Sequence, residues 1–342
     1  MIKRPTIADL AHASGVSVAT VDRVLNGRLP VREQTALRVV AAAESIGYHA
    51  TGLLKQRLNE APQRTFVFLL QKRQDEFYQA LARELAKATS IASFIRCKPV
   101  IEFIDELIPA VIAAKLREHG GRADAVAVVA VDHPHVNEAI EDLAQKGVPV
   151  FTVLTDVTAP SRAGYIGIDS RKAGRTAAWF ISRLAKDQGK IGVLLGTHRY
   201  LGQELAEISF RSYFREQAQE FQVLETVVDL EDDRIAYEAT LDILGKNGDL
   251  RGIYLAGGGM KGMIKALRDE KAGDRVIAVC NELLPYTRSA LVDGIIDLAL
   301  ATPISLLATQ LIEAMANAAK GGSRTGMKQM QLPAELYISE NI

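Results

Sequence analysis

The chain has 342 residues, of which 48% are hydrophobic and 24% are charged. These proportions are ordinary for folded globular proteins, and they exclude a disordered, collagen-like or disulfide-stapled chain. At roughly 100–200 residues per domain, the length predicts two or three compact units. The formal net charge is zero, from 41 basic and 41 acidic residues, so the molecule as a whole has no field that would attract nucleic acid or a membrane.

Two features of the sequence predict a cytoplasmic location. No apolar run approaches the roughly 20 residues that a membrane-spanning helix needs, and the N-terminal residues lack the apolar core of a secretory signal. Cys97 and Cys280 are the only cysteines, which fits a reducing compartment and leaves no CxxC metal site. We therefore expect no membrane contact, no bound metal and no cofactor.

Charge is distributed unevenly along the chain. Residues 1–58 hold eight basic and four acidic side chains, a balance of +4, and the remainder holds 33 basic and 37 acidic ones. A short N-terminal segment that meets an anionic partner is one interpretation, and a chance excess is the other.

Residues 1–60 predict three short helices. Thr6 and Asp9 have the spacing of a capping box, which starts a helix over 6–13. Ser17 can cap a second helix, and the third is predicted over 32–46 with a glycine after it. Small residues and a turn glycine between the first two helices are typical of a helix-turn-helix unit.

The run TIADLAHASGVSVATVDRVLNG, followed by a third helix that ends in IGY, resembles the DNA-binding head of the LacI/GalR family of transcriptional repressors. That family inserts the start of the second helix into the major groove, which implies that Val18, Ala19 and Arg23 face base edges. An arginine at such a position can bind guanine bidentately. The resemblance implies contacts that fix register on the phosphates for a second set, namely Thr6, Ser17, Thr20, Asn26 and Tyr48.

Two positions depart from the pattern of that family. Asp22 stands where the family commonly has serine, and its carboxylate repels phosphates unless it pairs with an arginine or with a base amine. The segment after Tyr48 lacks the proline of the family's hinge. A helix over 51–58 would place Leu54 in the minor groove, and a plain tether is the alternative.

Residues 61–342 alternate short apolar strands with amphipathic helices, which predicts parallel sheets covered on both faces. Nearly ten strands are too many for one sheet of this size, so the predicted fold class is α/β, with a small all-α head followed by two doubly wound parallel lobes. This body resembles the type I periplasmic-binding-protein domain that the LacI/GalR family carries as its effector domain. Crossings of the chain between the lobes are predicted near 158–163, 283–290 and 321–328. One strand is predicted over 224–230.

Ligands of open parallel sheets bind beyond the carboxyl ends of the strands, which predicts a site in the cleft between the lobes. Polar and aromatic side chains after the strands suit a small polyhydroxylated ligand such as a sugar or polyol. Among them, Asp132 and Asn281 have the best positions. The candidate effector-binding residues are Gln71, Phe77, Tyr78, Asp132, His133, Asp156, Thr197, His198, Arg199, Glu204, Gly258, Asn281 and Glu282.

The implied function is a transcriptional regulator, and a repressor is the expected type. A small-molecule effector would control its affinity for double-stranded operator DNA. Ala206 and Asn281 stand where the family's sugar-binding members often have arginine and aspartate, so the sequence does not indicate which sugar or polyol is the effector. A homodimer is expected, because one short recognition helix reads few bases. Two alternatives are a periplasmic-type sugar-binding protein and an enzyme that uses Gly257–Gly262 as a phosphate-binding loop.

Overall fold

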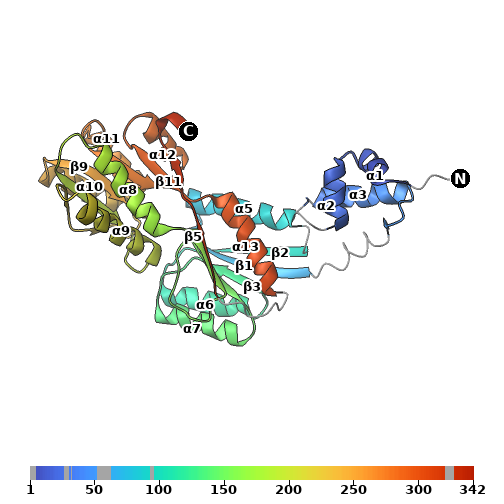
Figure 1. Cartoon of the computed structure of the whole chain (residues 1–342). Helices are drawn as coiled ribbons and strands as arrows, with labels where there is room; N and C mark the ends of the chain where they lie inside the picture. Colours follow the sequence, from blue (N-terminus) through green and yellow to red (C-terminus); the bar gives the residue numbers. More distant parts are fainter. Residues whose placement is uncertain (1–4, 27–30, 32, 52–62, 93–95, 320–326) are drawn as a thin grey trace.

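The computed structural model describes residues 5–26, 31, 33–51, 63–92, 96–319 and 327–342. A head of three helices lies at one end of the molecule and is followed by a larger body of two lobes (Figure 1). Within the described ranges, no helix has the length and apolar character needed to cross a bilayer. The helices of the head are α1 (Ile7–Ser14), α2 (Val18–Asn26) and α3 (Glu33–Ser45).

The head forms the predicted helix-turn-helix unit. At the start of α1 the Thr6 N–H donates to Asp9 Oδ2 at 2.8 Å, and the Asp9 N–H donates to Thr6 Oγ1 at 3.3 Å, so the capping box is confirmed. Gly15 ends α1 with φ of 65°, a left-handed conformation that glycine adopts without strain. Leu10 and Val21 are fully buried between the helices and anchor the small core.

The first lobe is built on a sheet of six parallel strands in the order β12-β5-β4-β3-β1-β2. Alternate residues of β1 point to opposite faces of this sheet: Phe66 and Phe68 pack beneath α5 and α13, whereas Val67 and Leu69 pack against α6 and α7. The elements are β1 (Gln63–Gln71), α5 (Glu76–Ile91), β2 (Arg96–Ile104), α6 (Pro109–Gly120), β3 (Ala125–Val128), α7 (Pro134–Gln145), β4 (Val150–Val153), β5 (Gly164–Ile168), α13 (Ile304–Ala319) and β12 (Lys328–Leu332).

The second lobe is built on a sheet in the order β13-β11-β10-β9-β6-β7, with β8 also paired to β6, and only β13 runs antiparallel to its neighbour among the pairs described. Helices α8 and α9 cover one face, and α10, α11 and α12 cover the other. The elements are α8 (Ser170–Leu184), β6 (Lys190–Leu195), α9 (Leu201–Gln217), β7 (Gln222–Val223), β8 (Val227–Val228), α10 (Asp233–Lys246), β9 (Leu250–Leu255), α11 (Met260–Asp269), β10 (Ile277–Asn281), α12 (Pro285–Val292), β11 (Leu298–Ala301), β13 (Glu335–Tyr337) and a 3₁₀ turn (Ser339–Asn341). The predicted pair of doubly wound lobes is confirmed.

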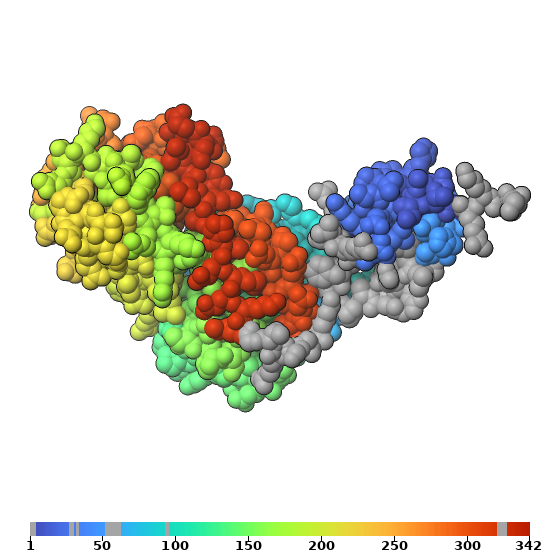
Figure 2. Space-filling model, in the orientation of Figure 1, coloured from blue at the N-terminus to red at the C-terminus, as the bar shows by residue number. Residues whose placement is uncertain are grey.

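The chain passes between the lobes three times, where β5 leads into α8, β11 into α13 and β12 into β13. In the space-filling view the C-terminal residues run across both lobes (Figure 2). The crossings predicted near 158–163, 283–290 and 321–328 are therefore wrong. The first of these segments joins two strands of one sheet, the second belongs to α12 inside the second lobe, and the described end of the third enters β12.

The strand predicted over 224–230 is wrong in its bounds, because β7 ends at Val223, before this stretch, and within it only Val227–Val228 form a strand, β8. Arg211 of α9 reaches the segment between them and donates from Nη2 to the Leu224 carbonyl and to Thr226 Oγ1, both at 2.6 Å. A guanidinium thus binds a backbone carbonyl and a side chain in the segment between β7 and β8.

Candidate functional site: an interlobe cavity and an exposed helix

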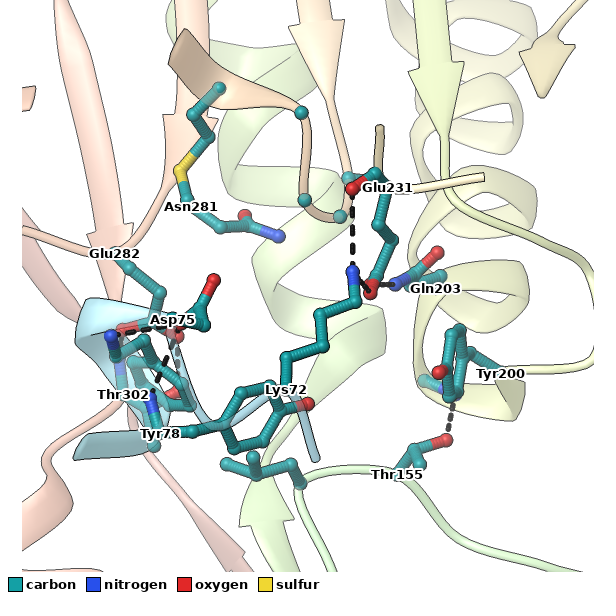
Figure 3. A pocket seen from close by; sticks show the side chains of 18 of the residues that line it. Lys72, Asp75, Tyr78, Thr155, Tyr200, Gln203, Glu231, Asn281, Glu282 and Thr302 are labelled. Atoms are coloured by element: carbon teal, nitrogen blue, oxygen red, sulfur yellow. Dashed lines mark hydrogen bonds and ion pairs between the residues drawn. The ribbon is translucent and has the colours of Figure 1, made fainter. Parts of the chain in front are cut away.

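A cavity of about 620 Å³ lies between the two lobes, at the place where the sequence predicts a ligand cleft. Its lining follows the carboxyl ends of β1 and β4 on the first lobe and of β6, β8, β9 and β10 on the second. The volume lies within the range of small-molecule sites in proteins. Figure 3 shows side chains from both lobes converging on this space.

Backbone strain concentrates at the edge of the cavity. Of the six non-glycine residues with left-handed φ that the described chain contains, four line the cavity: Lys72 (43°), Leu154 (65°), Glu231 (54°) and Glu282 (58°). Such conformations cost of order 1 kcal/mol or more each and persist where the surrounding structure imposes them. This concentration of strain is typical of a functional site.

Glu231 of the second lobe and Lys72 of the first meet inside the cavity (Figure 3). Lys72 Nζ lies 2.9 Å from Glu231 Oε2 and also donates to the Glu231 carbonyl at 3.3 Å. Gln203 Nε2 donates to the other carboxylate oxygen at 2.7 Å, while Gln203 Oε1 accepts the Gly196 N–H at 2.9 Å. Each carboxylate oxygen of Glu231 therefore has a partner, and the side chain is held in place.

A second cross-lobe contact centres on Gln71 at the end of β1. The hydroxyls of Tyr200, from the second lobe, and Tyr78 donate to Gln71 Oε1 at 2.9 Å and 3.2 Å. Gln71 Nε2 in turn donates to the Val129 carbonyl at 3.1 Å, which fixes the amide orientation. Burial raises the pKa of both tyrosines, so both keep their donor hydrogens at neutral pH.

Asn281, the last residue of β10, and Glu282, which follows it, lie in the cavity wall. The Glu282 carboxylate accepts from Thr302 Oγ1 at 2.6 Å and from the Thr302 N–H at 3.0 Å. Burial nevertheless raises the pKa of Glu282 to about 7, above its usual value of 4.5. Asn281 Oδ1 is buried and has no hydrogen-bond partner among the residues that the structure describes, so it can accept a hydrogen bond from a ligand.

Aromatic rings form much of the remaining wall. Phe77 packs against the cores of both lobes, and Tyr254 is almost fully buried behind the cavity. Lys261 Nζ lies 4.7 Å from the centroid of the Tyr286 ring and 3.1 Å from Glu76 Oε1 of the first lobe. Ring faces beside hydrogen-bonding groups suit a cyclic ligand with hydroxyl groups. Among the residues described, no three His, Cys, Asp or Glu side chains cluster as a metal site would require.

The structure brings five of the predicted effector residues into the lining: Phe77, Tyr78, Gly258, Asn281 and Glu282. Gln71 lies directly behind them, held by the two tyrosines. Seven predicted residues lie outside the lining, namely Asp132, His133, Asp156, Thr197, His198, Arg199 and Glu204.

These seven lie outside the lining, and their side chains or backbone groups have other contacts within the protein. Asp132 Oδ1 accepts from the Thr158 N–H at 2.9 Å, and His133 caps α7. Asp156 pairs with both Arg162 Nε and Nη2 at 2.7 Å. The other four lie where β6 leads into α9: Thr197 donates its N–H to Gln203 Oε1, His198 lies 3.9 Å from Glu207, Arg199 donates its N–H to Thr197 Oγ1, and Glu204 continues the first turn of α9.

Several lining residues were not predicted. The signal available in the sequence was a polar residue shortly after a strand: Lys72 comes directly after β1, and Glu231 comes three residues after β8. The unpredicted polar residues of the lining include Lys72, Asp75, Thr155, Gln203, Glu231 and Thr302.

Helix α2 exposes the side chains that the sequence assigns to DNA. Val18 is 52% exposed, and Ala19 and Arg23 are exposed on the same helix. Ser17 and Asn26 are also exposed at its two ends, while Thr20 and Asp22 are half-buried. The Thr6 N–H and the Thr6 hydroxyl both donate to Asp9 in the capping box.

Two further residues assigned to DNA differ in position. Tyr48 is only 6% exposed and packs in the core of the head. Leu54 and most of the predicted hinge helix lie outside the described residues.

Comparisons with known proteins assign both parts of the chain. Residues 6–51 match the family described as bacterial regulatory proteins, lacI family. Residues 66–323 match the periplasmic binding protein domain family. The chain belongs to this periplasmic-binding-protein family and carries a LacI-family head.

The curated relatives are regulators. The HTH-type transcriptional regulator MalR of Streptomyces coelicolor is 27% identical over 206 residues, which cover 57% of this chain and 55% of the relative. The ribose operon repressor of Bacillus subtilis is 40% identical over 78 residues, which cover 23% of this chain and 24% of that protein. The chain thus spans about half the length of the first curated relatives it matches.

The body has the fold of solute-binding proteins. An ABC transporter solute-binding protein from Burkholderia graminis in complex with D-arabinose superposes with a TM-score of 0.75 at 17% identity, covering 82% of this chain and 97% of the other. One from Bacillus halodurans with bound myo-inositol gives 0.72 at 16% identity, covering 82% and 96%. At these identities the likeness shows the fold.

Proposed function

We propose that this protein is a transcriptional regulator of the repressor type. Its affinity for operator DNA changes when a small polar ligand binds between the lobes. One observation carries the proposal. The same chain joins a LacI-family head, whose α2 exposes Val18, Ala19 and Arg23, to a cavity lined by two lobes that can close on a ligand. A DNA-reading surface and a ligand site are thus parts of one molecule.

The chemistry of the cavity favours an uncharged polyhydroxylated ligand, a sugar or polyol. Several of the lining charges are already compensated within the protein. Glu231 pairs with Lys72, and Glu76 pairs with Lys261. Asp75 accepts the Phe77 N–H of α5. A ligand that brings a further charge would leave it without a partner in a partly desolvated site, which is costly.

The polar atoms of the lining support the same ligand class. The buried Asn281 Oδ1 needs a donor, which a hydroxyl group supplies. Relatives of the same fold were solved with D-arabinose and with myo-inositol, which belong to this class. The side chains that we propose for effector contact are Lys72, Phe77, Tyr78, Tyr200, Asn281 and Glu282.

The alternative of a phosphate-binding enzyme receives little support from the glycine turn. Gly258 lies against Glu231, since a Cβ at Gly258 would lie 2.7 Å from the Glu231 Cβ. A phosphate group there would meet Glu231, Asp232 and Asp233, which all line the cavity. We infer that the turn serves close packing and that the protein is not an enzyme.

We further propose a homodimer that works on DNA in the cytoplasm. The exposed part of α2 spans a few residues, so one head reads only one half of an operator. Two heads related by a two-fold axis read both halves of a pseudo-palindrome.

Fluorescence anisotropy tests the proposed function. Operator fragments are first selected from random duplexes by the full-length protein, and ligands are chosen from a sugar and polyol panel by thermal shift. We expect salt-sensitive binding to the selected duplex, and a change of 5-fold or more in its affinity when the stabilising ligand is added. Absence of salt-sensitive duplex binding overturns the DNA assignment. An unchanged affinity with a ligand that does stabilise the protein overturns the effector assignment.

A further inference from the structure

The carboxyl end of β1 is bound by the second lobe at two consecutive residues. Gln71 accepts the Tyr200 hydroxyl at 2.9 Å, and Lys72 binds Glu231 at 2.9 Å. Tyr200 and Glu231 follow β6 and β8 of the second lobe, so both contacts cross the cleft. We call these four residues the β1 clamp.

The β1 clamp is well shielded from water. Gln71 is 1% exposed and Tyr200 is 5% exposed. The side chains of Lys72 and Glu231 are 28% and 13% exposed, against 51% and 42% for the Lys261–Glu76 pair at the cavity rim. An ion pair with little solvent around it is screened less by salt and is held in a defined geometry.

The β1 clamp also lies at the end of the first strand that follows the DNA-binding head in the chain. β1 starts at Gln63, the first residue described after the head, and ends at Gln71. Nine strand residues span roughly 30 Å at a rise of about 3.3 Å per residue. The strand is hydrogen-bonded on both sides, to β2 and β3, so its two ends move as one unit.

We propose that the β1 clamp holds the lobes together in the ligand-free protein and thereby sets the position of β1, and with it the head, before any effector binds. The clamp needs no ligand, since all four partners belong to this chain. Lys72 and Glu231 act as positioning residues. The effector then adjusts an arrangement that the protein's own ion pair has already biased.

Two backbone amides report on this arrangement directly. The Asp132 N–H donates across the cleft to the Arg199 carbonyl at 3.0 Å, and the Gly202 N–H donates to Thr155 Oγ1 at 3.3 Å. Both bonds join the lobes, and neither involves the β1 clamp. Their hydrogen exchange therefore measures lobe separation without DNA and without effector.

The experiment compares Lys72→Met with Lys190→Met in the full-length, ligand-free protein. Lys190 is a matched control, because its ammonium lies 3.2 Å from Asp249 and its side chain is 29% exposed, but both partners belong to the second lobe. We expect exchange at Asp132 and Gly202 to accelerate at least 5-fold in Lys72→Met and to stay unchanged in Lys190→Met. A charge swap, Lys72→Glu with Glu231→Lys, should restore the protection.

Operator affinity supplies a second readout, which rests on the proposed function, whereas hydrogen exchange does not. Lys72→Met should shift ligand-free operator affinity 5-fold or more, and the swap should return it toward the parent value. Unchanged exchange in a folded Lys72→Met protein, or a swap that leaves exchange fast, overturns the proposal. Accelerated exchange without a change in operator affinity supports the clamp between the lobes and overturns its link to the head.

Discussion

Asn26 Nδ2 donates to Asp22 Oδ1 at 2.6 Å, one turn apart on the exposed helix α2. Both residues were assigned to DNA from the sequence, and the bond gives Asp22 an uncharged partner in place of the arginine or base amine considered from the sequence. The amide orients the carboxylate but leaves its charge in place. A negative charge therefore stays on the helix that we assign to the major groove.

We expect Asp22→Ser to tighten binding to duplex DNA by about 1 kcal/mol, roughly 5-fold, because a carboxylate near phosphates is repulsive. Anisotropy titrations on selected and random duplexes measure the change. Asp242→Ser is the control, since Asp242 pairs with Lys246 at the same spacing on α10 of the body. Equal effects of both substitutions would remove Asp22 from the DNA surface.

Arg23→Ala should cost about 1–3 kcal/mol on the selected operator and leave binding to random duplex nearly unchanged, because a bidentate arginine discriminates between bases. Arg117→Ala, which removes the 2.7 Å pair with Asp142 between α6 and α7, serves as a control of equal charge change. A uniform loss on all duplexes would reassign Arg23 to a phosphate.

Asn281→Ala should weaken effector affinity by about 1–2 kcal/mol, since it removes a buried acceptor that has no partner within the described chain. Calorimetry with the stabilising ligand measures this loss. Asp132→Ala provides the contrast. Asp132 lies outside the lining and binds the Thr158 N–H, so we expect lower stability with little change in intrinsic effector affinity. Normal affinity in Asn281→Ala would exclude it from the site.

Glu282 makes stability depend on pH. Burial raises its pKa to about 7 in the folded protein from an ordinary 4.5, so the native state binds the proton more tightly than the unfolded state does. The stabilisation is complete below pH 4.5 and is lost as the pH rises to about 7. The Glu282→Gln side chain stays neutral at every pH. Between pH 5 and pH 8, the free energy of unfolding of this variant should fall by up to about 3 kcal/mol less than that of the parent, as measured by urea unfolding. Asp229, with a pKa raised to about 7, titrates in both proteins and cancels in the difference. Parallel pH profiles would refute the prediction.

Two glycines of the second lobe should respond oppositely to alanine. A Cβ at Gly262 would lie 1.8 Å from the Asp233 carbonyl oxygen, which would force α10 and α11 apart, so we expect Gly262→Ala to cost about 2 kcal/mol or more. No described atom lies within 4 Å of a Cβ at Gly245 in α10, so Gly245→Ala should stabilise by about 0.5–1 kcal/mol. Urea unfolding measures both, and a destabilising Gly245→Ala would show strain that the packing does not explain.

The head could be predicted from the sequence because its signals are local. The capping box at Thr6, the turn glycine Gly15 and the buried Val21 act within a few residues of one another. The apolar strands of the body were visible for a similar reason. The crossings between the lobes could not be predicted in this way, because they depend on which sheet each strand joins. Contacts between residues far apart along the chain decide that.

The ligand site was predicted in its location but only partly in its residues. Asp156 and Lys72 both follow apolar strands, yet Asp156 pairs with Arg162 in its own lobe and Lys72 extends across the cleft. The difference lies in the left-handed turn at Lys72, which no sequence pattern marks. The partner of Lys72, Glu231, lies 159 residues further along the chain.

The three crossings leave neither lobe as a continuous piece of the gene product. A stop codon after Thr302 would delete α13 and β12, uncovering Phe66 and Phe68 of the first lobe, and would also take β13 from the edge of the second. Truncation screens for a ligand-binding fragment should therefore retain the whole stretch from 63 to 342. An affinity tag at the C-terminus would sit on the lobe farther from the DNA-binding head (Figure 1).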